Sequence, residues 1–386
     1  MKKTIAILGA TGSVGTQALD VARARGYGVD FISVGSNIKL AEQIARELKP
    51  ATVAVADVSR ARELRLLLAD TDIRILAGEE GIVEGILKSR AETVVNSILG
   101  EAGLIPTLTV IDAKKRLALA NKESLVIAGD IVMSRALSAG VEILPVDSEH
   151  CAIYQSLKSG RQNEIKSLVL TASGGPFFGK TRDELRLVTL EETLAHPTWK
   201  MGKKITVDSA TLMNKGFEII EAAHLFGVSA DKIQVVIHRE SILHSAVEYI
   251  DNSIIGEMSV PDMRMCVQYA VDYPERHATQ SEPLSLEKIG RLTFMSPDTE
   301  AFPLLALAKR AMSAGGACPA IVNAADEIAV GAFLRGEIKF YQISEAVAET
   351  FEKMPYARDE RTLDGILAMD REARAICGEI IKEKMN

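Results

Sequence analysis

The chain has 386 residues, of which 47% are hydrophobic and 25% are charged, and its formal net charge is −7. This length is too great for one compact core, and an acidic balance without a Lys/Arg cluster excludes a nucleic-acid-binding surface. Four cysteines without metal-ligand spacing, and the lack of an apolar run long enough for a signal peptide or a membrane span, predict a cytoplasmic protein with no membrane partner.

In the first part of the chain, short apolar runs alternate with segments of helical spacing. The predicted strands cover residues 4–8, 29–34, 52–56, 73–77, 93–96, 117–120 and 141–146. Strand and helix alternating in this way predict a parallel sheet covered on both faces. We therefore expect an α/β protein with an N-terminal Rossmann-like domain over residues 1–147.

Three glycines, Gly9, Gly12 and Gly15, lie between the first predicted strand and the helix that follows it. In this context glycines allow a tight turn and let the backbone approach a pyrophosphate at the helix N-terminus. The spacing departs from the usual dinucleotide fingerprint, so a merely structural strand-to-helix turn is the alternative.

The tip of the second predicted strand reads Gly35-Ser36-Asn37, whereas Asp30 lies at the other end of that strand. An NAD enzyme usually places an acid at this tip for the ribose 2′-hydroxyl. No carboxylate here would repel a 2′-phosphate, which favours NADP.

Two carboxylates, Asp147 and Glu149, follow the apolar run at 141–146. If that run is a strand, alternating side chains place both on the same side of its end. Two hard oxygen ligands suit a divalent cation of the magnesium or manganese type, and strand ends of α/β proteins are where ligands collect. A solvated turn is the alternative for this pair.

Residues 120–124 also follow a predicted strand, and Lys122 stands there between a polar amide and an acid. Lys122 could face both a nicotinamide and a substrate oxygen. Alternatively, the segment is simply the start of a helix with Glu123 in its first turn.

After residue 147 the alternation ends, which predicts a central α+β domain over 148–272. Its predicted strands cover residues 165–171, 233–237, 245–249 and 254–260, with a helix beginning near residue 210. Residues 273–299 are rich in Pro, Ser and Glu and predict a connecting arm. Helical spacing throughout residues 300–386 predicts a C-terminal helical bundle.

Two loops of the central domain suit an anionic substrate. Ser173 precedes two glycines, which together offer a hydroxyl and exposed N–H groups, although a plain turn is the alternative. His196 lies in a Pro- and Gly-flanked segment with Trp199, the single Trp of the chain. Such a segment, about residues 193–203, suits either a lid that excludes water or a loop pinned to the core.

The densest polar cluster runs from residue 207 to residue 218. Ser209 can cap a helix that carries Asn214 and Glu218 on one face. Lys215 with the Ser and Asn groups would hold a phosphate, and Glu218 could complete the carboxylate set. A solvated helical face is the alternative.

Eight motifs follow one another along the chain: GATGSVG from Gly9, ANKESL from Ala120, VDSEH from Val146, SGGPF from Ser173, HPTWKMG from His196, VDSATLMNKGFE from Val207, PDMR from Pro261 and NAADE from Asn323. In this order and spacing they resemble the 1-deoxy-D-xylulose 5-phosphate reductoisomerase family, and the resemblance covers essentially the whole chain.

The resemblance implies a homodimeric enzyme that converts 1-deoxy-D-xylulose 5-phosphate into 2-C-methyl-D-erythritol 4-phosphate in the non-mevalonate isoprenoid pathway. It implies NADPH and a divalent cation, Mg²⁺ or Mn²⁺ with Co²⁺ as a further candidate. The family's route is retro-aldol cleavage, recombination to a branched aldehyde and hydride transfer, with the metal stabilising oxyanions as a Lewis acid.

The resemblance also implies roles for individual residues. The metal ligands would be Asp147, Glu149 and Glu218, and the catalytic residues Lys122, Glu149 and His196, with Glu149 a candidate proton acceptor. The substrate-binding residues would be Lys122, Ser148, Glu149, Ser173, His196, Ser209, Asn214, Lys215 and Glu218. The NADPH-binding residues would be Thr11, Gly12, Ser13, Val14, Gly35, Ser36, Asn37, Asn121, Glu123 and Gly202.

One position departs from many family members, which carry Lys where this chain has Ser36. Lys39 or Arg60 could supply the missing positive charge. Two rival functions share the nucleotide site: an NADP-dependent sugar-phosphate or semialdehyde dehydrogenase without isomerisation, and a non-catalytic NADP sensor. Neither rival requires three convergent carboxylates.

Overall fold

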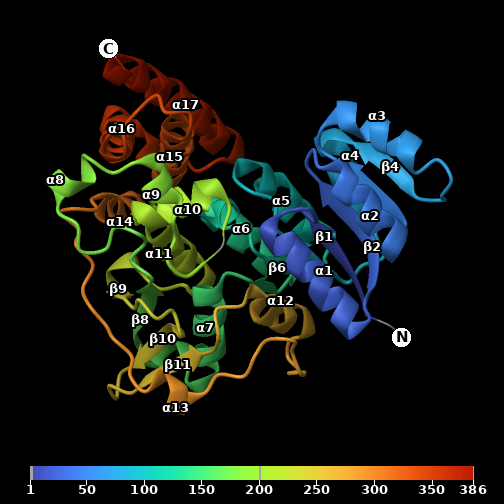
Figure 1. Cartoon of the computed structure of the whole chain (residues 1–386), viewed down its shortest axis with the longest axis horizontal. Helices are drawn as coiled ribbons and strands as arrows, with labels where there is room; N and C mark the ends of the chain where they lie inside the picture. The colour runs from blue at the N-terminus through green and yellow to red at the C-terminus, as the bar shows by residue number, and fades with distance from the viewer. Residues whose placement is uncertain (1–2, 200, 386) are drawn as a thin grey trace. The chain divides into compact units, whose positions relative to one another are not determined.

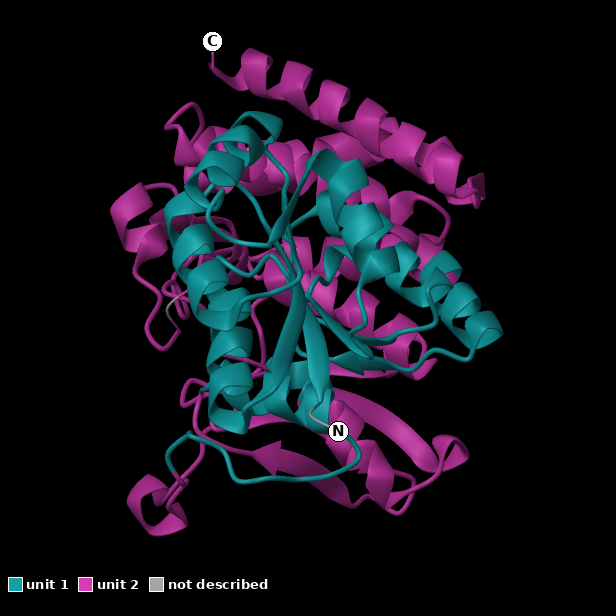
Figure 2. Ribbon diagram, turned by 90° about the vertical axis from the view of Figure 1, so that its right-hand side faces the viewer, with its two compact units in different colours: residues 1–124, 131–151, 262–282 teal, residues 125–130, 152–261, 283–386 magenta. Residues whose placement is uncertain are grey.

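The computed structural model describes residues 3–199 and 201–385 (Figure 1), which form two compact units (Figure 2). Unit 1 comprises residues 1–124, 131–151 and 262–282, and unit 2 comprises residues 125–130, 152–261 and 283–386. Both units are therefore discontinuous in sequence. Residues 262–272 group with unit 1, although the sequence analysis placed them in the central domain; the four-part linear division stays a prediction.

Unit 1 is built on a seven-stranded parallel sheet in the order β4-β3-β2-β1-β5-β6-β7, which confirms the predicted Rossmann-like sheet. Its strands are β1 (Thr4–Leu8), β2 (Gly28–Val34), β3 (Thr52–Val55), β4 (Arg74–Ala77), β5 (Thr93–Asn96), β6 (Arg116–Leu119) and β7 (Ile143–Pro145). These apolar strands are mostly buried, as in parallel sheets covered on both faces. The strand order reverses between β1 and β5, and ligands of open α/β sheets bind at such a switch point.

Helices precede or follow each strand of unit 1. They are α1 (Ser13–Arg25), α2 (Ile38–Leu48), α3 (Val58–Leu67), α4 (Gly78–Lys88), α5 (Leu104–Asp112), α6 (Glu123–Ala139), α7 (Ser148–Ser156) and α12 (Met263–Asp272), of which α6 and α7 also give residues to unit 2. The late helix α12 is tied to the start of the chain because Asp272 forms ion pairs with Lys3 at 3.5 Å and Arg25 at 3.3 Å.

Unit 2 contains a four-stranded sheet in the order β11-β10-β8-β9. Its strands are β8 (Ile165–Ala172), β9 (Ile233–Ile237), β10 (Leu243–Tyr249) and β11 (Ile254–Met258). Strand β8 is parallel to β9 and antiparallel to β10, and β10 is antiparallel to β11. The central strands are mostly buried, whereas the edge strand β11 is exposed over Ile254–Gly256.

The remaining helices belong to unit 2. They are α8 (Arg182–Leu185), α9 (Leu190–Leu194), α10 (Lys203–Ala210), α11 (Met213–Phe226), α13 (Leu286–Ile289), α14 (Leu304–Ala314), α15 (Cys318–Leu334), α16 (Phe340–Lys353) and α17 (Leu363–Met385). Helices α15, α16 and α17 lie against one another (Figure 1), which confirms the predicted C-terminal helical region. Among the described residues, no helix combines the length and the apolar composition needed to cross a membrane.

The helix predicted to begin near residue 210 is instead two helices. Helix α10 ends at Ala210 and α11 begins at Met213, because Leu212 adopts a left-handed conformation with φ 61°. Left-handed backbone costs a non-glycine residue roughly 1–2 kcal/mol, so local sequence gives little sign of it. The predicted cap was wrong: Ser209 lies in the last turn of α10, and no side chain caps α11.

Candidate active site

The turn after β1 requires its glycines. Gly9 has φ 77°, and a Cβ atom there would lie 2.7 Å from the Ser97 carbonyl oxygen. A Cβ atom at Gly15 would lie 2.1 Å from the Gly9 carbonyl oxygen, so α1 can approach the strand only without one. Gly12, the residue before α1, is exposed and its N–H donates to Gly9 at 2.9 Å. The first turn of α1 thus presents backbone N–H groups at the switch point, an arrangement that suits the binding of an anion.

The tip of β2 is accessible and carries no acid. Gly35, Ser36 and Asn37 are exposed, and Asn37 caps α2 by accepting a hydrogen bond from the Leu40 N–H at 3.3 Å. Asp30 is buried away from the tip; desolvation opposes its charge, but hydrogen bonds from Arg90 and Ser89 lower its pKa. The acid of β2 is therefore structural.

Both basic candidates for the 2′-phosphate are exposed residues on helices of unit 1. Lys39 is exposed on α2, and Arg60 is exposed on α3, where its guanidinium pairs with Glu63 at 2.9 Å. An exposed pair of this kind is weak, so it leaves the Arg60 side chain able to change partners.

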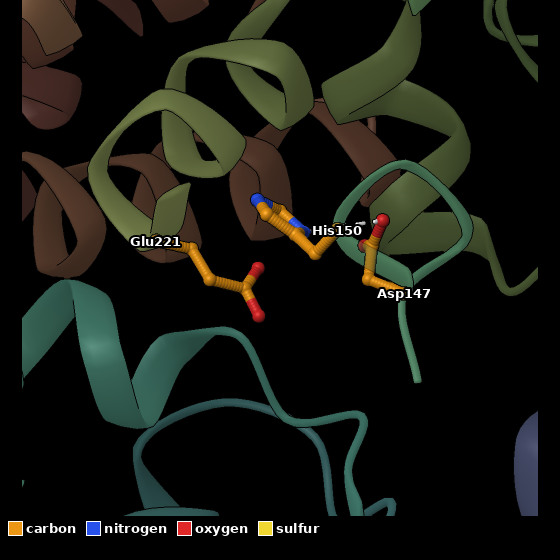
Figure 3. Close-up of side chains that lie close together, drawn as sticks. All are labelled: Asp147, His150 and Glu221. Carbon is orange, nitrogen blue, oxygen red and sulfur yellow. Dashed lines mark ion pairs between the residues drawn. The ribbon is translucent and has the colours of Figure 1, made fainter. Parts of the chain in front are cut away.

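The carboxyl ends of β6 and β7 bring Lys122 and Asp147 together. The Lys122 Nζ lies 2.9 Å from Asp147 Oδ2, and both side chains are largely buried. His150 Nδ1 lies 3.5 Å from Asp147 Oδ1, the pair joined by the dashed line in Figure 3. Burial alone favours the neutral acid, but the Lys122 ammonium and His150 hold the pKa of Asp147 well below its usual range. The Asp147 carboxylate is therefore ionised at neutral pH.

Glu149 reaches the neighbourhood of Asp147 by a different route from the one predicted. Strand β7 ends at Pro145, and Glu149 stands in the first turn of α7 rather than on an extended strand. The Glu149 N–H donates to Asp147 Oδ1 at 3.3 Å, and the Ser148 hydroxyl donates to Glu149 Oε2 at 2.5 Å. The prediction that strand alternation places Asp147 and Glu149 on the same side was thus wrong. The two acids lie close together because they stand at the N-terminus of α7, where negative charge is favoured.

Asn121 organises the loop after β6. Its side-chain amide donates to the carbonyl oxygens of Ile98 at 2.8 Å and Gly100 at 2.9 Å, and to Glu123 Oε2 at 2.9 Å. Glu123 stands in the first turn of α6, as the second reading of this segment predicted. Lys122, Asn121 and Glu123 are all buried, so their orientation is set by the fold.

In unit 2, His196 connects the two predicted phosphate-binding serines. Its Nε2 lies 3.0 Å from the Ser173 hydroxyl and 3.2 Å from the Ser209 hydroxyl. Its Nδ1 accepts hydrogen bonds from the N–H groups of Thr198 at 3.2 Å and Trp199 at 2.9 Å. An Nδ1 that accepts twice carries no proton, so the neutral ring holds its proton on Nε2 and directs it at the serines.

Burial makes the charged form of His196 unfavourable. Desolvation, with a smaller contribution from the Arg239 charge, lowers the pKa of His196 to about 4. Arg239 is itself fixed by donating to the carbonyl oxygens of Ser173 at 2.9 Å and Gly175 at 2.6 Å. The cluster therefore offers neutral donors beside a fixed positive charge, which suits a phosphate.

The helical cluster on α11 is buried rather than solvated. Lys215 is 4% exposed and Glu218 is 1% exposed. Lys215 donates to Glu218 Oε2, and the Asn214 amide donates to Glu218 Oε1 at 2.5 Å. The predicted common face of Asn214 and Glu218 is confirmed, and a buried carboxylate of this kind needs cationic partners.

Each unit thus brings together its own part of the predicted site. Unit 1 gathers Lys122, Asp147, Ser148 and Glu149, and it holds the predicted NADPH residues except Gly202. Unit 2 gathers Ser173, His196 and Ser209 in one cluster and Asn214, Lys215 and Glu218 in another. Gly202 precedes α10, and Lys200 of the predicted lid lies outside the described residues.

Three residues of these clusters carried no role in the sequence analysis. His150 borders Asp147, Arg239 holds the Ser173 loop, and the His244 ring centroid lies 6.2 Å from that of Trp199. The i,i+3 spacing of Asp147 and His150 on one helical turn was a usable signal. Arg239 and His244 had none, because they meet their partners through the pairing of β8, β9 and β10.

Family models match most of the chain. The model of 1-deoxy-D-xylulose 5-phosphate reductoisomerase matches residues 5–129, that family's C-terminal domain model matches residues 143–226, and the DXP reductoisomerase C-terminal domain model matches residues 258–376. Two curated relatives carry the name 1-deoxy-D-xylulose 5-phosphate reductoisomerase. The protein of Acetivibrio thermocellus is 51% identical over 99% of this chain and 100% of its own. The protein of Caldanaerobacter subterraneus subsp. tengcongensis is 50% identical over 97% of this chain and 98% of its own.

Solved structures agree with this relationship. The Zymomonas mobilis 1-deoxy-D-xylulose 5-phosphate reductoisomerase in complex with NADPH superimposes with a TM-score of 0.92 at 38% identity, covering 99% of both chains. A DOX-P reductoisomerase in complex with NADPH, fosmidomycin and magnesium superimposes with a TM-score of 0.93 at 40% identity, covering 98% of both chains.

Proposed function

The chain belongs to the 1-deoxy-D-xylulose 5-phosphate reductoisomerase family, and from that premise we propose which of its residues carry the reaction. It is an NADPH- and Mg²⁺-dependent oxidoreductase that rearranges and reduces 1-deoxy-D-xylulose 5-phosphate to 2-C-methyl-D-erythritol 4-phosphate, a step of isoprenoid biosynthesis. One observation carries the residue assignment: an ionised, largely buried Asp147 at the carboxyl end of the parallel sheet. Ligands of open α/β sheets bind at that end.

We assign the cation to Asp147, Glu149 and Glu218. Carboxylate oxygens are the ligands that Mg²⁺ prefers, and Mn²⁺ or Co²⁺ suits the same donors. Asp147 is held ionised, and Glu218 is a buried carboxylate that accepts hydrogen bonds from the Lys215 ammonium and the Asn214 amide, so both residues offer oxygen ligands to a cation. When bound, the metal acts as a Lewis acid that stabilises negative charge on substrate oxygens.

The catalytic roles fall to Lys122, Glu149 and His196. Lys122 keeps Asp147 ionised and is placed to donate a hydrogen bond to a substrate oxygen beside it. Glu149, held by the Ser148 hydroxyl, is the candidate to accept a proton from a substrate hydroxyl. Neutral His196 donates from Nε2 and covers the substrate from the lid.

The substrate phosphate is assigned to Ser173, Ser209, Asn214 and Lys215. The two hydroxyls already meet at His196, and Lys215 supplies the positive charge. These groups bind a part of the substrate that does not react, so their binding energy can fix the geometry of the carbons that do. A short phosphonate carrying a hydroxamate is expected to inhibit through the same groups and the metal. Fosmidomycin, which is bound together with magnesium in a related solved structure, is a further ligand to test.

NADPH is assigned to the segments that follow β1, β2 and β6 in unit 1 and to one residue of unit 2. Thr11, Gly12, Ser13 and Val14 meet the pyrophosphate at the N-terminus of α1, and Gly35, Ser36 and Asn37 meet the 2′-phosphate. Asn121, Glu123 and Gly202 complete the proposed contacts. Residues of about 193–203 form the proposed lid; among those described, the stretch between α9 and α10 has no helix or strand.

We propose a homodimer in the cytoplasm. The exposed edge strand β11 supports self-association, because it presents Ile254 at 61% and Ile255 at 39% exposure beside open backbone groups. All four cysteines are free thiols, which supports a reducing compartment.

The test of the reaction is NADPH oxidation on addition of 1-deoxy-D-xylulose 5-phosphate, with the product identified by NMR. Chelation should abolish turnover and Mg²⁺ should restore it. Glu218→Gln should lower kcat by about 100-fold or more, because even partners of metal ligands contribute 10–100-fold. Glu248→Gln, which removes a carboxylate paired with Lys166 in the same unit, is the control. Turnover that survives chelation favours the dehydrogenase, and NADPH binding without turnover favours the sensor.

A further inference from the structure

A buried ion-pair cluster at the start of α10 has no role in the assignments above. The Lys204 Nζ lies 2.6 Å from Asp208 Oδ2 and 2.8 Å from Asp326 Oδ2. Asp326 is fully buried on α15, and Asp208 is 3% exposed on α10. One partly exposed cation therefore joins α10 to the C-terminal helices through two buried carboxylates.

Both carboxylates belong to motifs that the sequence analysis quoted without giving them a role. Asp208 stands in VDSATLMNKGFE and Asp326 in NAADE. The Lys204 ammonium also lies 4.9 Å from the ring centroid of Phe217 on α11, a cation–π contact. The cluster therefore contacts three helices, and burial raises the pKa of the Asp326 carboxyl while the Lys204 charge opposes that rise.

Helix α10 connects this ion-pair cluster to the proposed phosphate-binding residues. The helix begins at Lys203, directly after the loop that holds His196 and Trp199. It carries Ser209 in its last turn, where the hydroxyl meets His196 at 3.2 Å. Eight residues are too few for a helix that is stable by itself, so the position of α10 depends on what it is anchored to.

We propose that Asp208 and Asp326 are positioning residues that act through Lys204, fixing α10 to α15 and so holding Ser209 and the His196 loop ready for the substrate phosphate. The inference rests on the proposed assignment of Ser209 and His196 to that phosphate. If only a fraction of molecules hold α10 in place, the apparent affinity for substrate falls to that fraction of its intrinsic value.

The test variant is Lys204→Met, which removes the cation and retains an unbranched stem over Phe217. The matched control is Arg374→Met. Arg374 likewise joins α15 to another helix through two carboxylates, at 2.8 Å from Glu327 and 2.5 Å from Asp370 on α17, and its side chain is 24% exposed against 30% for Lys204. The control therefore loosens the same bundle without touching α10.

Two readouts separate the anchor from the reaction. The first is acrylamide quenching of Trp199, the single Trp, in the ligand-free full-length enzyme; it should rise in Lys204→Met and stay at the wild-type value in Arg374→Met. The second is steady-state kinetics: KM for 1-deoxy-D-xylulose 5-phosphate should rise about tenfold, with kcat little changed, if about one molecule in ten holds α10 in place. In Lys204→Arg, which keeps the positive charge, the quenching and KM should both stay close to the wild-type values.

Equal quenching changes in Lys204→Met and Arg374→Met would overturn the proposal, since the effect would be general loosening of the bundle. Unchanged quenching in both variants would overturn it as well. Altered quenching in Lys204→Met alone with an unaltered KM supports the anchor, and it counts against the assignment of Ser209 to the phosphate. If Lys204→Met does not fold, Asp326→Asn, which removes one charge at nearly constant volume, is measured against Asp370→Asn in the same two assays.

Discussion

At the scale of single residues, neighbouring groups decide which side chains are charged before any ligand binds. Lys122 holds Asp147 as an anion, whereas burial and the nearby Arg239 charge hold His196 neutral. The two outcomes suit their proposed partners, because a cation needs an anionic ligand and a phosphate accepts hydrogen bonds.

His196 should stay neutral far below the usual range of a histidine. Its pKa is lowered from 6.5 to about 4. Between these two values the unfolded chain binds a proton at this ring and the folded protein does not. The free energy of unfolding should therefore decrease as the pH falls from about 6.5 to about 4. NMR titration of the His196 ring and urea unfolding at pH 7 and pH 5 measure this. His196→Gln should lose that part of the pH dependence, and a titration midpoint near 6.5 would contradict the prediction.

Ser36 should make the preference for NADPH over NADH narrower than a lysine would. Its hydroxyl offers a neutral hydrogen bond, and charge-assisted bonds are about twice as strong. Ser36→Lys should lower KM for NADPH, more at low salt, and leave NADH almost unaffected. If Ser36→Lys leaves the ratio of the KM values for NADPH and NADH unaltered, Lys39 or Arg60 already binds the 2′-phosphate. The variant Arg60→Met then tests the contribution of Arg60. A native preference for NADH would contradict the assignment of the β2 tip.

At the scale of elements, the turn from β1 to α1 is the tightest part of the nucleotide site. Gly15→Ala would place a Cβ atom 2.1 Å from the Gly9 carbonyl oxygen, so α1 must move. We expect a loss of about 1–3 kcal/mol in unfolding free energy, as for other overpacked sites, and weaker NADPH binding by calorimetry.

The control for this turn is Gly378→Ala on α17, where a Cβ atom meets nothing within 4 Å. There we expect a gain of about 0.5–1 kcal/mol, because alanine favours a helix more than glycine does. Equal NADPH affinity in Gly15→Ala and the wild type would show that α1 does not set the pyrophosphate position.

The elements show what sequence can and cannot predict. Strands β1, β5 and β9 begin and end where the apolar runs predicted. In β1 and β5 the reason is that a parallel strand buried on both faces contains consecutive apolar residues. The break at Leu212 could not be predicted, since a leucine with positive φ is held by its surroundings and not by its own preference.

The candidate site follows the same rule. The pairing of Asn214 with Glu218 came from helical spacing and is confirmed. The contact of Lys122 with Asp147 depends on β6 lying beside β7, and that of Arg239 with Ser173 on the loops that follow β8 and β9. Strand order is a property of the whole chain, so residue spacing alone does not encode these contacts.

At the scale of the whole molecule, the proposed homodimer should depend on β11. Ile254→Lys would bury a charge in any interface made by this edge, so we expect the dimer to weaken by at least about 2 kcal/mol, roughly thirtyfold. Sedimentation velocity across a concentration series measures this. Leu66→Lys on α3, where Leu66 is 78% exposed, is the control and should leave the dimer intact. If the Ile254→Lys dimer is as stable as the wild-type dimer, the dimer interface does not include β11.

The discontinuity of unit 1 has a consequence for synthesis of the chain. Lys3 and Arg25 leave the ribosome early, yet their partner Asp272 follows only after the 110 residues from 152 to 261 have been translated. Unit 1 therefore cannot complete its fold while residues 1–151 emerge, because residues 262–282 are still missing. A gene fragment that stops at residue 261 omits α12 and its ion pairs. Removing the C-terminal part of the sequence therefore also damages unit 1, most of which lies in the N-terminal part.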